Sequence, residues 1–236
     1  MNLLTVISWL WSQPGGRVAY RAEHVNIWAD MVRRNLTLPH QIACVTDMPK
    51  GIDPSVRIIG PPDDFLGIAI PSWSPERPQC FRRLALFRPD AGAIFGDRFV
   101  SMDLDCVIGD ILDPLFETDA DFKINASHRM PQVAYNGAML LMTAGARPQV
   151  YHRFSIDEML TAGLKLAGSD QAWISHVLGA GEATWGESDG VTWYGSGAPR
   201  RRVLFFPGLP KPWDRIGGDY FVTRHYRRSA ADRIAA

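Results

Sequence analysis

Apolar runs alternate with amphipathic stretches along the first part of the chain. Leu3 to Leu10 is almost entirely apolar, which is typical of a central strand buried on both faces. Residues 22–36 carry apolar side chains at helical spacing, and Pro39 lies just past them. Two short apolar segments, residues 41–47 and 56–60, predict two more strands. A strand, a helix and a strand in this order indicate a parallel sheet with helices on its faces.

The pattern continues with more interruptions toward the carboxyl end. Residues 61–78 are rich in proline and predict a loop or lid rather than a linker between domains. Beyond this loop, the pattern predicts a helix at 80–87, strands at 98–102 and 137–145, helices around 151–160 and 169–178, and further apolar segments at 121–127 and 202–208. We therefore expect one α/β domain over residues 1–236, with a short tail or helix at 229–236. Its sheet should be mixed but mostly parallel, of the Rossmann type, with helices on both faces.

The composition excludes some partners. The 236 residues are 46% hydrophobic and 21% charged, which is ordinary for a globular chain. Lys plus Arg equals Asp plus Glu, at 25 each, so no overall field draws the protein to nucleic acid or an anionic membrane. We expect no nucleic-acid partner and at most a peripheral membrane contact. Two arginine-rich runs, 200–202 and 224–228, could touch an anionic acceptor or lipid headgroups, although solvated basic runs are commoner.

The cysteines and the first residues bear on the compartment. Cys44, Cys80 and Cys106 are odd in number and lack the spacing of a metal site or a disulfide framework. The apolar segment at residues 3–11 has no basic leader, is too short to span a bilayer and precedes no small-residue cleavage site. These features predict a cytoplasmic protein with reduced thiols.

Two aspartates, Asp103 and Asp105, stand between the predicted strand at 98–102 and a second apolar run. Strands of open α/β sheets deliver their carboxyl ends to the ligand crevice, so both carboxylates are expected there and, by alternation, on one side. Carboxylates this close repel each other unless a cation lies between them. Oxygen ligands favour Mg²⁺ or Mn²⁺, which complete their shells with water and substrate phosphates. The plainer interpretation is a strand end with two solvated aspartates.

Five segments in order resemble nucleotide-sugar glycosyltransferases of the GT-A fold, particularly the glycogenin-like and galactosyltransferase-like family eight. They are "RRLALF", the Asp-x-Asp segment "SMDLDCVIGDILDPLF", "YNGAMLLM", "GSDQAWIS" and the loop "FFPGLPKPWD". The resemblance spans roughly Leu3 to Asp214. It implies a GT-A-like sheet and a hexosyltransferase that uses a nucleotide-diphosphate sugar as donor. The acceptor would be a saccharide, a glycolipid or a protein.

The resemblance also implies a role for each matching residue. Asp103 and Asp105 would hold Mn²⁺ or Mg²⁺. Lys211 would meet the pyrophosphate as a point charge, Asp170 would lie beside the donor sugar, and Gln171 would lie near the anomeric carbon of a retaining transfer. The other residues expected to approach the donor are Arg83, Asn136, Gly137, Gly208 and Trp213.

Plainer roles remain open for several of these residues. Asp170 could belong to a helix N-cap, because helix starts commonly recruit aspartate. Asn136 could be a satisfied turn residue. Lys211 and Trp213 could be a surface lysine and a packing tryptophan. Two further tryptophans, Trp9 and Trp11, follow the first strand, where a nucleotide base could stack, although core packing is the commoner use of such rings.

One position departs from the family pattern. The family places a metal-ligating histidine three residues before the loop glycine, and Phe205 stands there. Two carboxylates, donor phosphates and water would then form the metal site, so we expect weak metal binding without donor. His225 is the least remote alternative ligand in the sequence.

Two other functions compete with the transferase. Haloacid dehalogenase-like phosphatases also place Asp-x-Asp after an apolar strand, and their first aspartate is a nucleophile, but the later acidic pair they need is missing here. A catalytically silent nucleotide-sugar-binding protein on the same fold would also be consistent with the missing histidine.

Overall fold

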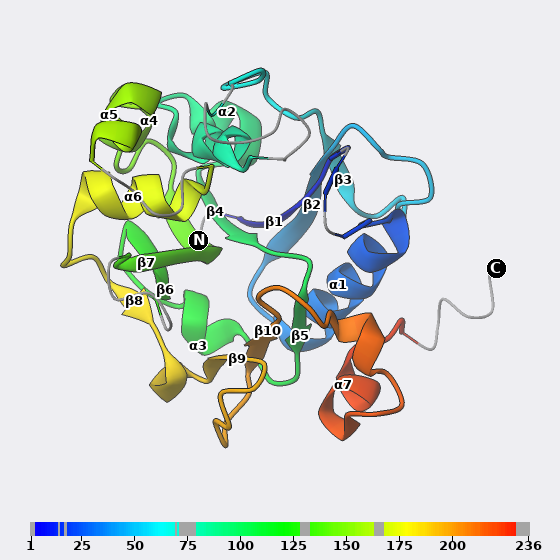
Figure 1. Cartoon of the computed structure of the whole chain (residues 1–236). Coiled ribbons are helices and arrows are strands. Elements are labelled where there is room, and N and C mark those ends of the chain that lie inside the picture. Colours follow the sequence, from blue (N-terminus) through cyan, green and yellow to red (C-terminus); the bar gives the residue numbers. More distant parts are fainter. Residues whose placement is uncertain are drawn as a thin grey trace.

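A seven-stranded sheet with the order β3-β2-β1-β4-β7-β6-β8 forms the centre of the computed structural model (Figure 1). The structure describes residues 3–13, 15–16, 18–68, 70, 79–127, 133–162 and 168–229. The strands of this sheet are β1 (Leu4–Leu10), β2 (His40–Thr46), β3 (Arg57–Ile59), β4 (Arg98–Met102), β6 (Phe122–Ala126), β7 (Tyr135–Thr143) and β8 (Thr184–Trp185). β7 runs antiparallel to β4 and β6, and the other pairs are parallel. The mixed, mostly parallel sheet that the sequence predicts is confirmed.

A second sheet explains why the aspartates interrupt the apolar sequence. Its three strands are β5 (Cys106–Ile108), β9 (Val191–Trp193) and β10 (Val203–Phe205), in the order β5-β10-β9. The apolar run behind Asp105 is therefore not a continuation of β4. The chain leaves the large sheet after Met102 and enters the small sheet at Cys106, so Asp103 and Asp105 occupy the crossing.

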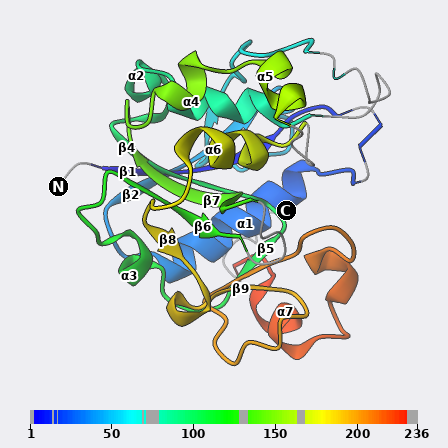
Figure 2. The same ribbon diagram turned by 60° about the vertical axis from the view of Figure 1, so that its left-hand side comes forward.

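Helices cover both faces of the large sheet. The helices among the described residues are α1 (Ala22–Asn35), α2 (Ala91–Phe95), α3 (Asp113–Phe116), α4 (Gln149–His152), α5 (Ile156–Thr161), α6 (Asp170–Leu178) and α7 (Tyr220–His225), with 3₁₀ helices η1 (Phe81–Phe87), η2 (Glu187–Asp189) and η3 (Pro212–Arg215). α7 contacts β5 of the small sheet. Figure 2 shows α2, α4 and α6 on one side of the sheet and α1 on the other. This arrangement matches the predicted helices on both faces.

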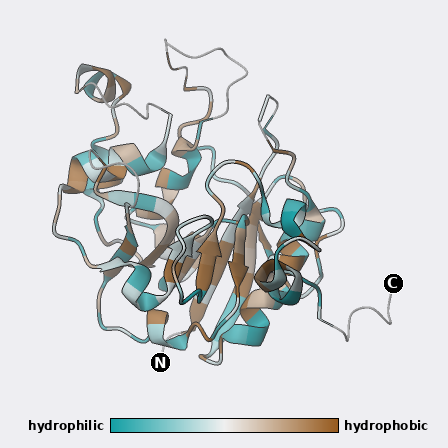
Figure 3. Ribbon diagram, turned by 60° about the horizontal axis from the view of Figure 1, so that its bottom comes forward, coloured by the Kyte–Doolittle hydropathy of each residue, from teal (hydrophilic) through white to brown (hydrophobic). Residues whose placement is uncertain are grey.

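Neighbouring residues of β1 point into two separate hydrophobic cores. Val6 belongs to the core that contains Trp28 of α1, whereas Ile7 belongs to the core that contains Phe81 of η1 and Trp173 of α6. Because strand side chains alternate between faces, a strand covered on both sides is mostly apolar, and the two buried polar side chains of β1 are those of Thr5 and Ser8. Figure 3 shows the resulting concentration of apolar residues in the central strands.

Most predicted elements are present. The segments at 3–10, 22–36, 56–60 and 98–102 contain β1, α1, β3 and β4, the segment at 41–47 overlaps β2, and the helix predicted at 80–87 is the 3₁₀ helix η1. Of the proline-rich segment, residues 69 and 71–78 lie outside the described residues, as do residues 230–236 of the predicted tail. Within the described ranges, no helix is both long and apolar enough to cross a membrane.

The strand directions bring several chain segments to one edge of the large sheet. β1 and β4 are parallel, and β4 and β6 are both antiparallel to β7. The carboxyl ends of β1, β4 and β6 therefore meet the amino end of β7 at the same edge. Ligands of open α/β sheets bind at such an edge, where the strand order reverses.

Candidate active site

The two aspartates are held in place from both sheets. The backbone N–H of Asp103 donates to the carbonyl of Ala138 in β7 at 2.8 Å. The backbone N–H of Phe206, just after β10, donates to the carbonyl of Asp105 at 2.9 Å. The crossing segment therefore has fixed backbone partners at each end, and both carboxylates lie at the edge where the sequence places them.

Arg83 of η1 joins three parts of the site. Its Nη1 lies 2.8 Å from Oδ1 of Asp103 and its Nε lies 3.2 Å from Oδ2 of Asp170. Its Nη2 donates a short hydrogen bond to the carbonyl of Gly137. The guanidinium is 8% exposed. A buried, planar cation with this many partners fixes the positions of both carboxylates.

The charges of this cluster perturb one another. Burial alone would lower the pKa of Arg83, but the carboxylates of Asp103 and Asp170 outweigh it and raise that pKa. Burial and the nearby charge of Asp105 raise the pKa of Asp103 above its usual range, while Arg83 opposes the rise. Burial also raises the pKa of Asp170. Burial therefore makes the charged forms of Asp103 and Asp170 costly even with Arg83 beside them.

Lys211 and Tyr20 converge on Asp105. The Nζ of Lys211 makes a short ion pair with Oδ2 of Asp105 and donates to the carbonyl of Phe206 at 3.1 Å. The hydroxyl of Tyr20 donates to the same Oδ2 at 3.1 Å. Lys211 is 5% exposed, so it is not the surface lysine of the plainer interpretation. In this structure its partner is a carboxylate of the site.

The loop that carries Lys211 has a defined shape. Gly208 has a φ of +86°, a left-handed conformation that favours glycine. Nothing lies within 4 Å of the position that a Cβ would take there, so the glycine serves the backbone conformation. The N–H of Lys211 donates to Oδ2 of Asp214 at 2.8 Å, which starts η3 directly after the lysine.

The amino end of α6 meets the amino end of β7. Oε1 of Gln171 accepts hydrogen bonds from Nδ2 of Asn136 at 2.9 Å and from the N–H of Gly137 at 3.3 Å. Oδ1 of Asn136 accepts from the N–H of Ala138 at 2.9 Å. A Cβ on Gly137 would lie 3.3 Å from both carboxylate oxygens of Asp170, so the glycine allows that close approach. Four predicted residues, Asn136, Gly137, Asp170 and Gln171, therefore lie together.

Trp213 stacks on a histidine. The rings of His24 and Trp213 lie 3.9 Å apart with an interplanar angle of 12°, and Tyr20 meets Trp213 edge-on at 5.7 Å. Burial lowers the pKa of His24. The aromatic group therefore links the start of α1 to η3, beside the Asp105–Lys211 pair.

Sequence reasoning missed Tyr20 and His24. Tyr20 is 85 residues from Asp105 in the chain, and neither residue belongs to a motif or a periodic pattern. His24 supports Trp213 by stacking. Tyr20 lies just before α1 and His24 in its first turn, at the start of the first long helix after β1, a position that often faces the ligand crevice of such folds.

The charges and free oxygens of the site are compatible with a divalent cation. Three carboxylates, Asp103, Asp105 and Asp170, face two cations, Arg83 and Lys211, which leaves one negative charge uncompensated. Oδ2 of Asp103 and Oδ1 of Asp105 accept no hydrogen bond within the part of the chain that the structure describes. Two carboxylates with free oxygens suit a hard cation that completes its shell with phosphates and water.

A third protein ligand is not found among the described residues, where no group of three or more metal-ligating side chains occurs. Phe205, at the position of the family histidine, is 1% exposed and packs in the core against Trp193. His225 on α7 lies against the ring of Phe221, and among the described residues it forms no metal-ligating group with the two carboxylates.

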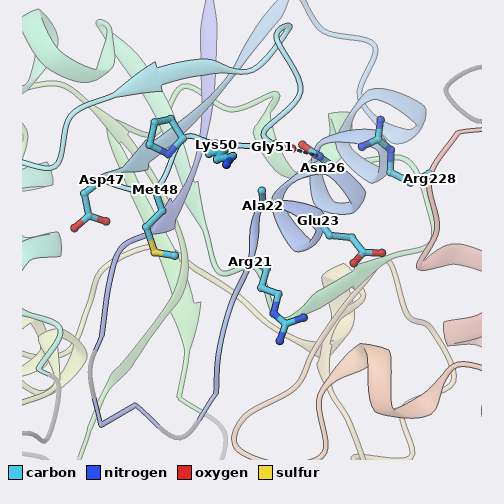
Figure 4. A pocket seen from close by; sticks show the side chains of 10 residues that line it. Arg21, Ala22, Glu23, Asn26, Asp47, Met48, Lys50, Gly51 and Arg228 are labelled. Atoms are coloured by element: carbon cyan, nitrogen blue, oxygen red, sulfur yellow. Dashed lines mark hydrogen bonds between the residues drawn. The ribbon is translucent and has the colours of Figure 1, made fainter. Parts of the chain in front are cut away.

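Three other features lie apart from the site. Trp9 is buried, and its Nε1 donates to the hydroxyl of Ser101 at 3.1 Å, so its role is core packing. Trp11 is only partly buried and meets Trp9 edge-on at 5.7 Å. A surface pocket between the start of α1, the loop after β2 and Arg228 contains none of the predicted site residues (Figure 4).

The arginine-rich runs are partly built into the fold. Arg202 is 4% exposed and donates to the carbonyls of Ile111 and Asp189. Arg228 lies 2.9 Å from Oδ2 of Asp30, a buried carboxylate of α1. Arg202 and Arg228 are therefore bound within the fold, whereas the sequence suggests that both runs are solvated.

Comparisons with solved structures show the fold. A galactosyltransferase LgtC, crystallised with donor and acceptor sugar analogs, matches with a TM-score of 0.59 and 15% identity over 98% of this chain and 100% of its own. The glycosyltransferase GlyE of Streptococcus pneumoniae TIGR4 matches with a TM-score of 0.55 and 15% identity over 90% of this chain and 56% of its own. The bifunctional glycosyltransferase WbbM matches with a TM-score of 0.62 and 12% identity over 99% of this chain and 51% of its own.

These likenesses identify a GT-A-like glycosyltransferase fold. No protein-family model matches the sequence, and no curated protein matches it by sequence.

Proposed function

We propose that this protein is a glycosyltransferase that moves a sugar from a nucleotide-diphosphate donor to an acceptor. The observation that carries the proposal is the cluster at the sheet edge, where Asp103 and Asp105 meet the buried cations Arg83 and Lys211. Sugar transfer needs groups that stabilise a departing diphosphate, and buried cations beside two carboxylates supply them. The fold shared with LgtC, GlyE and WbbM supports the same function.

Asp103 and Asp105 would hold Mn²⁺ or Mg²⁺ together with the donor diphosphate. Such an ion supplies positive charge to the leaving oxygens when it is bound. Lys211 would exchange its carboxylate partner for the diphosphate, since an ammonium can pair with either anion. Arg83 would hold the carboxylates of Asp103 and Asp170 in fixed positions relative to each other, because its guanidinium contacts both.

The sugar of the donor would lie over the meeting point of β7 and α6. Asp170 is held by Arg83 at 3.2 Å, and its second oxygen accepts from the N–H of Gln171 at 2.9 Å. Without donor, Oε1 of Gln171 accepts from Asn136 and Gly137, which keeps Gln171 at this meeting point. We assign Asp170 to the sugar hydroxyls and Gln171 to the anomeric carbon of a retaining transfer, as the resemblance implies.

A binding protein without turnover is the second candidate, and the burial of Phe205 at the family histidine position favours it. Such a protein would bind donor but would not hydrolyse or transfer it. The phosphatase alternative has less support, because the later acidic pair that this class needs does not follow in the sequence.

A thermal-shift screen of UDP-, GDP-, CMP- and dTDP-sugars with Mn²⁺ tests the proposal. A donor at about 100 times its dissociation constant adds about 2.7 kcal/mol of stability, so one nucleotide class should raise the melting temperature. Slow release of free sugar from that donor would establish turnover. Binding without release would favour the binding protein, and trapping by beryllofluoride would favour the phosphatase.

A further inference from the structure

β7 bulges where it carries residues of the candidate site. Asn125 of β6 pairs with Asn136 of β7, whereas the preceding residue, Ile124, pairs with Leu140. Residues 137–139 therefore have no partner on β6. A bulge of this kind frees backbone groups from the sheet ladder and re-aims them.

Backbone groups of residues 137 and 138 contact the site, and the carbonyl of Ala138 does so on the side of β7 that faces β4. The carbonyl of Gly137 accepts from Arg83, and its N–H donates to Gln171. The carbonyl of Ala138 accepts from the N–H of Asp103 at 2.8 Å. Each group that the proposed function places around the donor sugar therefore depends on the position of this segment.

Asn125, directly opposite the bulge, has a buried carboxamide that is unpaired. The residue is 1% exposed, and neither Nδ2 nor Oδ1 has a hydrogen-bond partner in the described ranges. Asn26 of α1 is also buried, but its Nδ2 donates to the carbonyl of Gly51 and its Oδ1 accepts from the N–H of Asp53. Burial of an unpaired amide destabilises a fold, so its presence next to a functional segment calls for a role.

The register pairs Asn125 with Asn136, the residue of β7 just before the unpaired segment. Residues directly opposite in an antiparallel pair project on the same face, with Cβ atoms about 4.5–5.5 Å apart. Nδ2 of Asn136 carries two hydrogens, and Gln171 takes one of them. Asn125 can therefore offer an acceptor to Asn136 and a donor to a carbonyl of the bulge.

We propose that Asn125 is a positioning residue that holds the bulge of β7 when donor is bound. The inference rests on the proposed function. Donor that engages Arg83 and Gln171 draws them away from Asn136 and Gly137, which then lack partners. The carboxamide of Asn125 replaces those partners, because it offers both a donor and an acceptor. The carboxamide of Asn125 is therefore unpaired in the donor-free protein and paired in the complex with donor.

The test compares Asn125→Leu with Asn26→Leu, the same change at a buried asparagine whose partners are present. Without donor, Asn125→Leu should raise the melting temperature, whereas Asn26→Leu should lower it. With the donor found in the thermal-shift screen, the stabilisation by donor should shrink in Asn125→Leu. Its kcat should fall roughly tenfold, which is the loss expected from one hydrogen bond, while KM for the donor should change less than kcat.

Asn125→Ala repeats the measurements without added volume and should show the same loss of kcat. The positioning role requires both results for Asn125→Leu, the higher melting temperature without donor and the weaker response to donor, and the absence of either overturns it. The unmodified protein in the same assay reports separately on the proposed function, because a protein that is not a transferase will show no turnover of the donor.

Discussion

Lys211 and Asp105 form a buried ion pair between the loop after β10 and the crossing after β4. The two residues are 106 positions apart in the chain, and their side chains are 6% and 14% exposed. A donor diphosphate that recruits Lys211 must break this pair, and a cation that binds Asp105 must compete with it. The donor and the cation are therefore expected to bind together, because each releases the residue that the other needs.

Lys211→Met should separate the effect of Lys211 on the donor from its effect on the cation. Turnover should fall on the order of 100-fold or more, because the ammonium that stabilises the leaving diphosphate is lost, while affinity for the free nucleoside diphosphate should fall less. Mn²⁺ should bind more tightly to the donor-free variant, because Asp105 no longer has a competing cation. Paramagnetic resonance measures the bound Mn²⁺, and Lys50→Met, at an exposed lysine, is the control. Weaker Mn²⁺ binding in Lys211→Met would contradict the competition.

Asp105→Asn and Asp103→Asn should differ in stability although both abolish metal-dependent turnover. Asp105→Asn leaves the buried ammonium of Lys211 without a carboxylate, which should cost about 3 kcal/mol. Asp103→Asn should cost less stability, because Nε of Arg83 still has Oδ2 of Asp170 as a partner at 3.2 Å. Relief of repulsion between the two aspartates should be smaller than the loss of these ion pairs, because each carboxylate already has a cation. Urea unfolding of both variants measures the difference, and the reverse order would argue against the ion-pair assignment.

Phe205→His should destabilise the protein without creating a metal ligand. Phe205 is buried against Trp193, so the polar ring should cost on the order of 3 kcal/mol. Phe99→His, at a fully buried residue of β4, should cost a similar amount. Mn²⁺ binding by the donor-free protein should be unchanged in both variants. Tighter Mn²⁺ binding in Phe205→His alone would show that the position faces the carboxylates.

His24 should make stability depend on pH. Burial lowers its pKa in the folded protein, so the unfolded chain binds the proton first as the pH falls below about 6.5. Stability is therefore fully present above that pH and is lost as the pH falls toward the folded pKa. His24→Phe keeps an aromatic ring beside Trp213 but cannot be protonated, so its melting temperature should fall less between pH 7.5 and 5.5. Equal falls would exclude His24 as the titrating group.

The sequence predicted the elements whose hydrophobic pattern extends over many residues. β1 and α1 show continuous apolarity and helical spacing over many residues, which is why their bounds agree closely with the predictions. The small sheet was not predicted, because strands of three residues such as β5 and β9 cannot show a period.

Within the candidate site, the residues that belong to motifs were predicted. The residues that contact them and hold them in place were not. Tyr20 contacts Asp105 only because the fold closes the start of α1 onto the crossing after β4. Asn125 stands out only once burial and partners are known. Such contacts arise from tertiary structure and leave no local pattern in the sequence.

Donor turnover by the unmodified protein and by the two aspartate variants tests the central claim most directly. With the donor found by thermal shift and Mn²⁺ present, the unmodified protein should release or transfer sugar, and a chelator should stop it. Asp103→Asn and Asp105→Asn should remain folded, as near-unchanged circular dichroism would show, and should have no metal-dependent turnover. Turnover in both variants at the rate of the unmodified protein would contradict the assignment of the active site to Asp103 and Asp105.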